Sequence, residues 1–366
     1  MKSKISLLVG IYPPDAGGPA IFAERFRKWC ESVDINCFVI TYATKNLNST
    51  SGVAKIQLRS PRILSFVKFI FRVVKCSKDS EIIIANGCFL EVYLASFFLK
   101  ADYVIKLPGD PIWEIARNRN LTTLSIEKFQ RAPRGIFLKI LQFFFNLAYR
   151  KAKYVICPST QLFEFAQNWG VNEKNLRVIY NSVDPDIFCR SHFEKPVFDL
   201  VTTSRLVGWK NVEEIIRISA SMHLSLAIAG VGPELDRLKR LSKDLDARVV
   251  FLGEVENREI PKILAKSRCF VLNSEFEATS YSLIEAKMMG LPVVARASAG
   301  SCEVIRHNID GYLATSGEDI KLAISKIFSE FRFDEFSIAA REDALARFNQ
   351  STNFSSIVQI LKHSNA

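Results

Sequence analysis

Two carboxylates and a polar turn stand out in the stretch 273–286, which follows an apolar run at 269–272 and precedes a helical run. Glu277 lies in the expected turn, and Glu285 lies in the expected first turn of the helix, with seven residues between them. Backbone N–H groups at a helix N-terminus bind phosphate, and carboxylates accept hydrogen bonds from sugar hydroxyls. The N–H groups concerned are those of Ala278, Thr279 and Ser280. The stretch predicts a site for an anionic, hydroxylated ligand.

A capping role is the alternative for Glu285. Ser282 and Glu285 have the spacing of a capping box, in which the glutamate satisfies only an N–H group of its own helix. The choice between ligand and cap depends on what the rest of the chain brings to the same place.

Two cations, Arg205 and Lys210, follow another expected strand at 198–203. Asn211 and Glu214 can cap the next helix, so both cations fall at the carboxyl end of the strand, on the same edge as Glu277. A guanidinium and an ammonium there can bind a diphosphate and stabilise its charge as it leaves. Two solvated loop cations are the alternative.

Glycines mark two further turns at strand ends. Gly17 and Gly18 precede the first expected helix and would let the backbone approach a negative ligand, although an ordinary tight turn explains them as well. Gly230 and Gly232 superficially resemble a dinucleotide-binding fingerprint. Leu235 replaces the third glycine, so we reject an NAD site.

Asp110 follows the expected strand at 103–107, within the sequence P-G-D-P. A carboxylate at the carboxyl end of a strand can contact a sugar acceptor. A plain turn explains the same residues nearly as well.

Strands that end at a common edge are needed to position these residues. Apolar runs alternate with helical stretches in two series, which predicts an α/β protein of two doubly wound parallel-sheet domains facing each other across a cleft. The expected strands are 5–10, 37–41, 81–85, 103–107, 154–157 and 176–180 in the first series, and 198–203, 225–229, 249–252, 269–272 and 293–295 in the second. The expected domains are 1–188, 189–345 and a C-terminal helical segment, 346–366, that packs back on the first domain, with a linker at 190–196.

Composition narrows the class of protein. A chain of 366 residues with 48% apolar residues can form two cores. Its eight cysteines include no C-x-x-C pair and its four histidines have no metal-ligand spacing, so we expect neither a disulfide framework nor a metal site. The N-terminal apolar run is short for a signal peptide, and charges interrupt every apolar run before about 18 residues. We expect a soluble or peripheral protein of the cytoplasm.

The net charge of +11 is unevenly distributed. Residues 1–185 contain 26 Lys and Arg against 14 Asp and Glu, whereas residues 186–366 contain 23 against 24. The expected helices at 62–78 and 128–153 combine phenylalanines with basic residues, as helices lying in a membrane interface do. Core helices with a basic edge are the alternative. We expect an anionic membrane surface, and not nucleic acid, as the partner of this half.

Together these motifs resemble the retaining glycosyltransferases of family 4. They are P-P-x-x-G-G at 13–18, N-S-V-D at 181–184, R-x4-K at 205–210, E-x7-E at 277–285 and G-L-P-V-V-A at 290–295. Their order and spacing match over nearly the whole chain. The resemblance implies the GT-B fold, with two Rossmann-like domains, and transfer from a nucleotide-sugar donor without a metal ion.

The resemblance also implies roles for single residues. Arg205 and Lys210 would hold the donor diphosphate, and Glu277 would contact hydroxyls of the donor sugar. Further donor contacts would come from Glu285 at the ribose, Gly17 and Gly18 at the diphosphate, and Gly253 and Glu254 near the base. Because the family shows no obvious enzyme nucleophile, the implied mechanism is attack on the same face, driven by stabilisation of the leaving group.

The chain departs from the family pattern in two places. Many relatives have E-G-F-G where this chain has Glu277-Ala278-Thr279-Ser280, which predicts a different fit around the sugar. Many also carry a histidine after an N-terminal-domain strand, but the first histidine here is His192. Asp110 stands near the expected place, so we include it among the candidate catalytic residues.

The favoured function is therefore a glycosyltransferase that acts on a membrane-held acceptor linked to polyprenyl diphosphate. It would work at the inner face of the plasma membrane, in surface polysaccharide or glycolipid assembly. A hydrolysing nucleotide-sugar epimerase or a glycoside phosphorylase could share the architecture. A non-enzymatic basic protein that binds lipid or nucleic acid is the alternative from another class. This alternative does not explain the R-x4-K and E-x7-E motifs.

Overall fold

The computed structural model describes residues 4–15, 17–43, 51–58, 61–189, 196–329 and 333–362. The chain divides into two compact units, unit 1 (Met1–Ile179 and Phe354–Ala366) and unit 2 (Tyr180–Asn353). The expected limits at 188 and 345 differ from these divisions by several residues. The expected linker at 190–196 lies almost entirely outside the described residues. No helix in the described part of the chain is long and apolar enough to cross a membrane.

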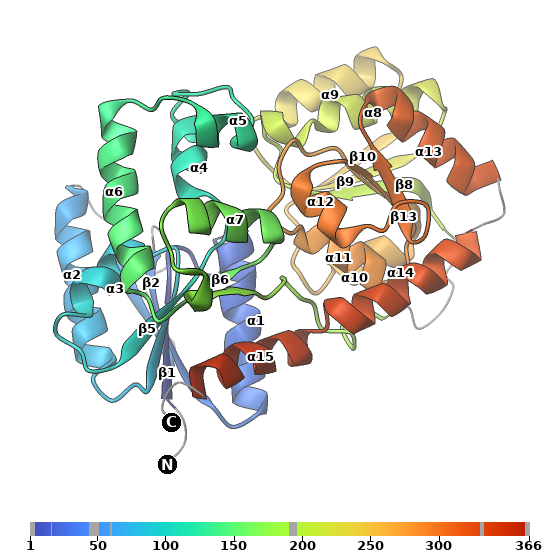
Figure 1. Ribbon diagram of the computed structural model, residues 1–366. Helices are drawn as coiled ribbons and strands as arrows, with labels where there is room; N and C mark the ends of the chain where they lie inside the picture. Colours follow the sequence, from blue (N-terminus) through green and yellow to red (C-terminus); the bar gives the residue numbers. More distant parts are fainter. Residues whose placement is uncertain are drawn as a thin grey trace. The chain divides into compact units, whose positions relative to one another are not determined.

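Unit 1 contains a parallel sheet with the strand order β3-β2-β1-β4-β5-β6-β7 (Figure 1). The strands are β1 (Lys4–Val9), β2 (Asn36–Ala43), β3 (Val53–Gln57), β4 (Ile82–Asn86), β5 (Asp102–Lys106), β6 (Tyr154–Cys157) and β7 (Leu176–Val178). The helices are α1 (Gly18–Ser32), α2 (Arg62–Cys76), α3 (Phe89–Ala95), α4 (Pro111–Asn118), α5 (Ile126–Arg131), α6 (Ile136–Lys151) and α7 (Thr160–Asn168), with a short 3₁₀ turn at Glu173–Asn175. Strand β4 is buried throughout, because helices cover both faces of the sheet.

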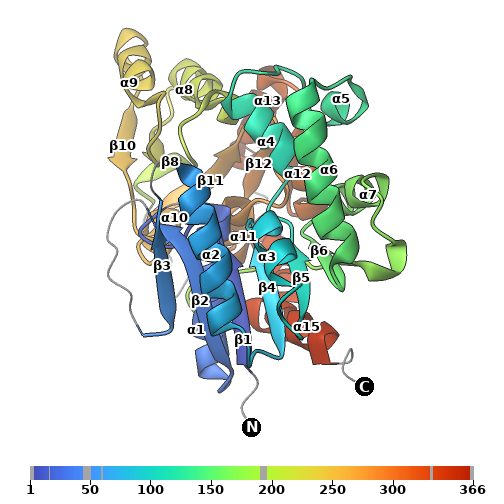
Figure 2. The same ribbon diagram turned by 90° about the vertical axis from the view of Figure 1, so that its left-hand side faces the viewer.

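The helices of unit 1 form two layers around its sheet. Figures 1 and 2 show α2, α3 and α6 side by side on one face and α1 on the other. The last helix of the chain, α15 (Gln350–Lys362), begins in unit 2 and ends in unit 1. Its Phe354 packs against three aromatic rings of α1, at centroid distances of 5.8 Å from Phe22, 5.2 Å from Phe26 and 5.7 Å from Trp29. This contact fixes α15 to α1.

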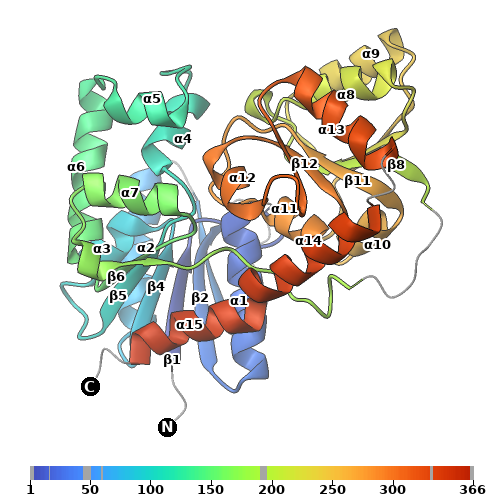
Figure 3. The ribbon, with the colours of Figure 1, turned by 45° about the vertical axis from the view of Figure 1, so that its right-hand side comes forward.

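Unit 2 contains a second parallel sheet, with the order β10-β9-β8-β11-β12-β13 (Figure 3). The strands are β8 (Phe198–Thr203), β9 (Leu226–Ala229), β10 (Val249–Gly253), β11 (Ser267–Leu272), β12 (Val293–Arg296) and β13 (Gly311–Ala314). The helices are α8 (Val212–Ser221), α9 (Leu235–Asp244), α10 (Ile260–Ala265), α11 (Tyr281–Met288), α12 (Ala299–Val304), α13 (Gly317–Ser329) and α14 (Phe333–Arg347), with a 3₁₀ turn, η2, at Gly208–Lys210. Residues of α8, α9 and α13 form one apolar core, and residues of α10, α11 and α12 form another.

A buried ionic cluster joins the helices on the second face of this sheet. The Lys287 ammonium, on α11, is fully buried and lies 2.6 Å from an Asp343 oxygen and 3.1 Å from an Asp310 oxygen. It also donates to the Val304 carbonyl at 2.6 Å. Arg347 pairs with Asp343 at 2.6 Å. Because the carboxylates surround the ammonium, the cluster fixes α11 against α14 and the loop before β13.

The two parallel sheets of the described residues confirm the predicted fold class, but several elements differ from the prediction. The edge strand β3 was not predicted, and neither was β13. The predicted helix at 128–153 is two helices, α5 and α6, since residues 132–135 include Pro133, which lacks the N–H group that a continuing helix needs. The predicted helical segment 346–366 contains the end of α14 and all of α15, and its residues from Phe354 onward belong to unit 1.

Candidate functional site

The strand order of unit 2 places a topological switch point between β8 and β11. The two strands pair directly, with Leu200 beside Cys269 and Val201 beside Phe270. From β8 the chain proceeds to β9 and β10 on one side, and from β11 to β12 and β13 on the other. The loops that leave β8 and β11 therefore diverge, and ligands of open α/β sheets bind where such loops part.

The loop after β8 carries Arg205 and Lys210. Its backbone is hydrogen-bonded to the turn after β9, from Ser204 N–H to the Ala229 carbonyl at 3.0 Å and from Leu206 N–H to the Val231 carbonyl at 3.0 Å. A Cβ atom at Gly230 would lie 1.9 Å from the Ser204 carbonyl oxygen. The glycine turn that superficially resembled a dinucleotide fingerprint thus lets two backbones approach each other.

Lys210 and Glu277 form an ion pair between the loop after β8 and the loop after β11. Their side chains are only 18% and 11% exposed. The Glu275 N–H also donates to the Trp209 carbonyl at 2.9 Å, which joins the same two loops through their backbones. The structure thus brings together two of the predicted catalytic residues. The Arg205 side chain is exposed on the same loop as Lys210.

A half-buried carboxylate fixes the base of these loops. Glu214, on α8, accepts hydrogen bonds from the side-chain amides of Asn211 at 2.9 Å and Asn273 at 2.5 Å. Asn211 occupies the N-cap position of α8 in a left-handed conformation, with φ of 49°, and its side chain makes no capping bond to the helix backbone. The expected cap is therefore replaced by a bridge between the ends of β8 and β11.

Two contacts far apart in sequence hold the loop at 273–280. The Asn181 side chain, from the N-S-V-D motif, donates to the Thr279 carbonyl at 2.9 Å. Gly300, on α12, packs so closely that a Cβ atom there would lie 2.1 Å from the Glu277 carbonyl oxygen and 2.6 Å from that of Ala278. The sequence prediction missed Gly300. Its only signal is a glycine in the small-residue run S-A-G-S after β12.

Helix α11 follows this loop and carries Glu285. Ser280 is the N-cap residue, and Ser282 lies inside the helix, so the alternative of a capping box between Ser282 and Glu285 is wrong. Glu285 is the fifth residue of α11, in its second turn and not in the first as predicted, and it is only 6% exposed. Thr279 and Ser280 are also buried at the start of the helix.

Gly253 and Glu254 lie at the end of β10. Gly253 has φ of +70°, and its carbonyl accepts a hydrogen bond from the Gly230 N–H at 2.7 Å. The end of β10 is thereby joined to the glycine turn that contacts the Arg205 loop. Glu254 is exposed there.

The remaining candidates belong to unit 1. Gly17 is the N-cap residue of α1, with φ of +152°, and Gly18 is the first residue of that helix. A Cβ atom at Gly17 would lie 2.8 Å from the Ile11 Cδ1 atom.

Asp110 is fully buried and caps α4. One carboxylate oxygen accepts hydrogen bonds from the N–H groups of Ile112 and Trp113, at 2.9 and 3.1 Å, and the other accepts from the Gln130 amide at 2.6 Å. Burial raises the pKa of the Asp110 carboxyl, against these hydrogen bonds and the nearby Arg134 charge. Both oxygens hold helices in place, and a role in acceptor chemistry stays a prediction.

The site in unit 2 thus combines two cations, two glutamates and a loop at a helix N-terminus. Among the described residues, no group of three or more His, Cys, Asp or Glu side chains is placed to hold a metal ion. That the reaction needs no metal stays a prediction. The cations are suited to a diphosphate and the carboxylates to hydroxyl groups.

Comparison with known proteins agrees with this arrangement. A family model described as glycosyl transferases group 1 matches residues 186–338, and one described as glycosyltransferase family 4 matches residues 113–187. An uncharacterized glycosyltransferase of Methanocaldococcus jannaschii is 28% identical over 200 residues, which are 50% of this chain and 51% of that protein. The chain matches about half the length of the first curated relatives.

Two further matches extend over nearly the whole chain. An uncharacterized protein in the cps region of Klebsiella pneumoniae is 23% identical over 348 residues, covering 91% of this chain and 93% of that protein. The crystal structure of Anabaena HepE in complex with UDP aligns with a TM-score of 0.77 and 21% identity, covering 98% of this chain and all of that one. Its likeness shows the fold. The chain belongs to the glycosyltransferases of the family 4 type, with the GT-B fold.

Proposed function

We propose that this protein transfers a sugar from a nucleotide-sugar donor, with retention of anomeric configuration. The observation that carries the proposal is the Lys210–Glu277 pair, which joins the two loops at the switch point of unit 2 beside Arg205. The Anabaena protein of similar fold binds UDP, which supports a nucleotide donor.

The chemistry follows from the charges at the switch point. Arg205 and Lys210 would hold the donor diphosphate and stabilise its charge as the bond to the sugar breaks. Glu277 would orient the sugar by accepting hydrogen bonds from its hydroxyls. Its carboxylate is ion-paired with Lys210, which would bind the adjacent phosphate. Glu285 would bind the ribose, and Gly253 with Glu254 would contact the base. The acceptor hydroxyl would attack the face that the diphosphate leaves, without a nucleophile from the protein.

We further propose that the acceptor is a glycan held at a membrane by polyprenyl diphosphate, in surface polysaccharide assembly. One relative of nearly the same length is described as a protein in a cps region, which supports a polysaccharide product. Unit 1 supports a membrane location through exposed apolar side chains on adjacent helices. They are Ile63, Leu64, Val67 and Phe71 of α2, Phe97 and Phe98 after α3, and Ile136, Phe137, Ile140, Phe143 and Phe144 of α6.

Basic residues border this exposed apolar surface. Arg62, Lys68, Arg72 and Lys75 are exposed on α2, and the Lys151 ammonium of α6 lies 3.4 Å from the centroid of the Phe97 ring. Exposed phenylalanines can enter the acyl boundary while the cations contact anionic headgroups. The protein would therefore act as a peripheral protein on the inner face of the plasma membrane.

A transfer assay tests the proposed function. The full chain is incubated with UDP-, GDP-, ADP- or dTDP-sugars and a polyprenyl-diphosphate-linked sugar, and the extended lipid is measured. One donor is expected to be consumed only when acceptor is present, with retained configuration in the product. Conversion of a nucleotide sugar without acceptor would instead identify an epimerase. Transfer unaffected in both Arg205→Ala and Lys210→Ala would refute the assigned diphosphate site.

A further inference from the structure

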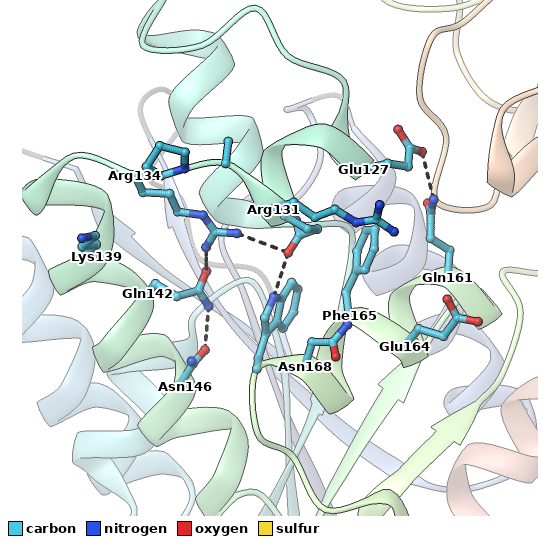
Figure 4. A pocket seen from close by; sticks show the side chains of 14 residues that line it. Glu127, Arg131, Arg134, Lys139, Gln142, Asn146, Gln161, Glu164, Phe165 and Asn168 are labelled. Atoms are coloured by element: carbon cyan, nitrogen blue, oxygen red, sulfur yellow. Dashed lines mark hydrogen bonds between the residues drawn. The ribbon is translucent and has the colours of Figure 1, made fainter.

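A polar cavity lies wholly within unit 1, and none of the residues assigned to the donor lines it. Its volume is about 690 Å³, and α5, α6, α7 and the segment between α5 and α6 enclose it (Figure 4). The lining residues used below are Arg131, Arg134, Lys139, Gln142, Asn146 and Asn168. None of them belongs to a motif of the family resemblance.

Arg134 is a fixed cation at this cavity. Its guanidinium donates to the Gln142 side-chain oxygen at 2.8 Å and to that of Gln130 at 3.3 Å, and it lies 4.6 Å from the centroid of the Phe129 ring. Gln130 is in turn held by Asp110 at 2.6 Å and by the Trp169 indole at 3.2 Å. The guanidinium is thus positioned before any ligand arrives, which lowers the entropy lost on binding.

Two further cations, Arg131 and Lys139, line the cavity on either side of Arg134 (Figure 4). Arg131 and Lys139 are exposed at the cavity, which thus has three cationic lining residues against two acidic ones. Of the acidic residues, Glu127 accepts a hydrogen bond from Gln161 at 2.9 Å, and Glu164 is exposed on α7. Figure 4 shows Arg134 directed toward Gln142. Arginine and lysine side chains that line a cavity can bind phosphate groups.

Side-chain amides make the rest of the cavity suited to hydroxyl groups. Gln142 and Asn146 reach it from α6, where they are hydrogen-bonded to each other at 2.6 Å, and Asn168 reaches it from α7. Each amide offers donors and an acceptor, as a sugar hydroxyl requires. Phe165 and Trp169 add aromatic surface. The cavity therefore suits a phosphorylated sugar better than a simple anion.

Helix α6 connects the cavity to the apolar surface. Lys139, Gln142 and Asn146 recur at spacings of three and four, so they form one stripe of the helix that faces the cavity. Ile140 and Phe144 form another stripe and are 52% and 46% exposed. Helix α6 thus carries a polar stripe that faces the cavity and an exposed apolar strip formed by Ile140 and Phe144.

We propose that the cavity binds the sugar-diphosphate head of an isoprenoid lipid, whose chain lies along the exposed apolar strip of α6. That this lipid is also the sugar acceptor rests on the proposed function. That the cavity and the strip bind the head and the chain does not rest on it, because this binding depends only on residues of unit 1.

Calorimetric titration of the full chain with three probes tests the proposal. The probes are farnesyl-diphosphate-linked N-acetylglucosamine, N-acetylglucosamine 1-phosphate, which lacks the chain, and farnesyl diphosphate, which lacks the sugar. The complete probe is expected to bind at least about tenfold more tightly than either part, since both surfaces are then used. Equal binding of the complete probe and farnesyl diphosphate would refute the role of the cavity.

Paired variants separate the cavity from general charge. Arg131→Gln with Lys139→Gln is expected to weaken the complete probe by about tenfold or more, because two phosphate contacts are lost. Lys239→Gln with Lys243→Gln removes the same charge from exposed positions of α9 and is expected to change nothing. Equal losses in both pairs would reduce the effect to net charge and overturn the proposal.

The apolar strip has its own variant. Ile140→Ser with Phe144→Ser is expected to lower affinity for the complete probe toward that of the head alone, while leaving N-acetylglucosamine 1-phosphate unchanged. Unchanged affinity for the complete probe would overturn the placement of the chain. Nucleotide-sugar binding by the unsubstituted chain separates the two proposals. If the unsubstituted chain binds a nucleotide sugar but not the lipid probe, only the cavity proposal falls, and if it binds only the lipid probe, the proposed transfer falls.

Discussion

Lys106 shows how a single buried charge makes the stability of unit 1 depend on pH. It lies at the end of β5, is 3% exposed, and its ammonium lies 4.6 Å from the centroid of the Phe22 ring. Burial lowers its pKa to about 8, against an opposing contribution from Cys157. The unfolded chain therefore binds more protons than the folded chain between about pH 8 and about pH 10.4.

We predict that Lys106 lowers stability most at neutral pH and that this penalty disappears as the pH rises through that window. Lys106→Met should be the more stable protein at pH 7, by up to about 3 kcal/mol. The free energy of unfolding of the wild type should approach that of Lys106→Met by pH 10, because Lys106 is then neutral in the folded chain. Urea unfolding of both proteins from pH 7 to pH 10 measures the difference. A difference that stays constant would contradict the buried, shifted lysine.

Lys287 is buried too, but carboxylates surround it. Lys287→Met would leave Asp310 and Asp343 with fewer cations in the core of unit 2, which we expect to lower the free energy of unfolding by about 3–5 kcal/mol. Lys243→Met, at an exposed position of α9, is the matched control and should change it by less than about 0.5 kcal/mol. Chemical denaturation of both variants provides the comparison, and similar values for the two would contradict a structural role for the cluster.

At the scale of elements, the close packing of α12 against the loop after β11 gives Gly300 its importance. Helix propensity alone predicts that Gly300→Ala stabilises α12 by about 1 kcal/mol. The new Cβ atom would instead meet the Glu277 carbonyl oxygen at 2.1 Å and displace the loop. We therefore expect lower stability, by about 1–3 kcal/mol, and nucleotide-sugar affinity at least about tenfold weaker.

Gly135→Ala is the control for that substitution. No atom lies within 4 Å of a Cβ built at Gly135, which precedes α6 with an ordinary φ of −60°. Thermal unfolding and titration with the preferred donor should show little change there. If Gly300→Ala behaved in the same way, the loop would not depend on α12.

Elements with a continuous apolar run could be predicted from the sequence, and β6 and β8 have the predicted limits. The edge strand β3 could not, because its five residues, V-A-K-I-Q, form a short run that Lys55 interrupts and its pairing to β2 is a tertiary contact. Pro133 was a signal for a break between α5 and α6. The prediction of one long helix instead followed the continuous basic, phenylalanine-rich pattern.

Spacing likewise predicted which residues gather at the switch point, but not how they pair. Arg205, Lys210 and Glu277 were found from their places after strands. The Asn181–Thr279 bond joins residues 98 positions apart, and no local pattern predicts it. Asp110 had a local signal, because an aspartate directly before a proline is typical of an N-cap followed by proline in the first helical turn.

At the scale of the whole molecule, the basic excess and the exposed phenylalanines both belong to unit 1. We predict that the full chain binds phosphatidylglycerol vesicles and binds phosphatidylcholine vesicles more weakly, since each basic residue near an anionic surface contributes about 1 kcal/mol. Phe71→Ser with Phe98→Ser, at side chains 70% and 73% exposed, should reduce binding by about tenfold or more.

Vesicle sedimentation measures this binding. Ile338→Ser, at an exposed apolar residue of α14 in unit 2, is the control and should bind as the wild type does. Equal binding to both kinds of vesicle, or an equal loss in the control, would contradict a membrane surface on unit 1.

The central claim is that Arg205 and Lys210 of unit 2 bind the donor diphosphate. Calorimetric titration with the preferred nucleotide sugar tests it most directly, in wild type, Arg205→Ala, Lys210→Ala and the exposed control Lys239→Ala. We predict affinity at least about tenfold weaker in the first two variants, with unfolding temperatures close to that of wild type, and no change in the control. Wild-type affinity in both Arg205→Ala and Lys210→Ala would contradict the account.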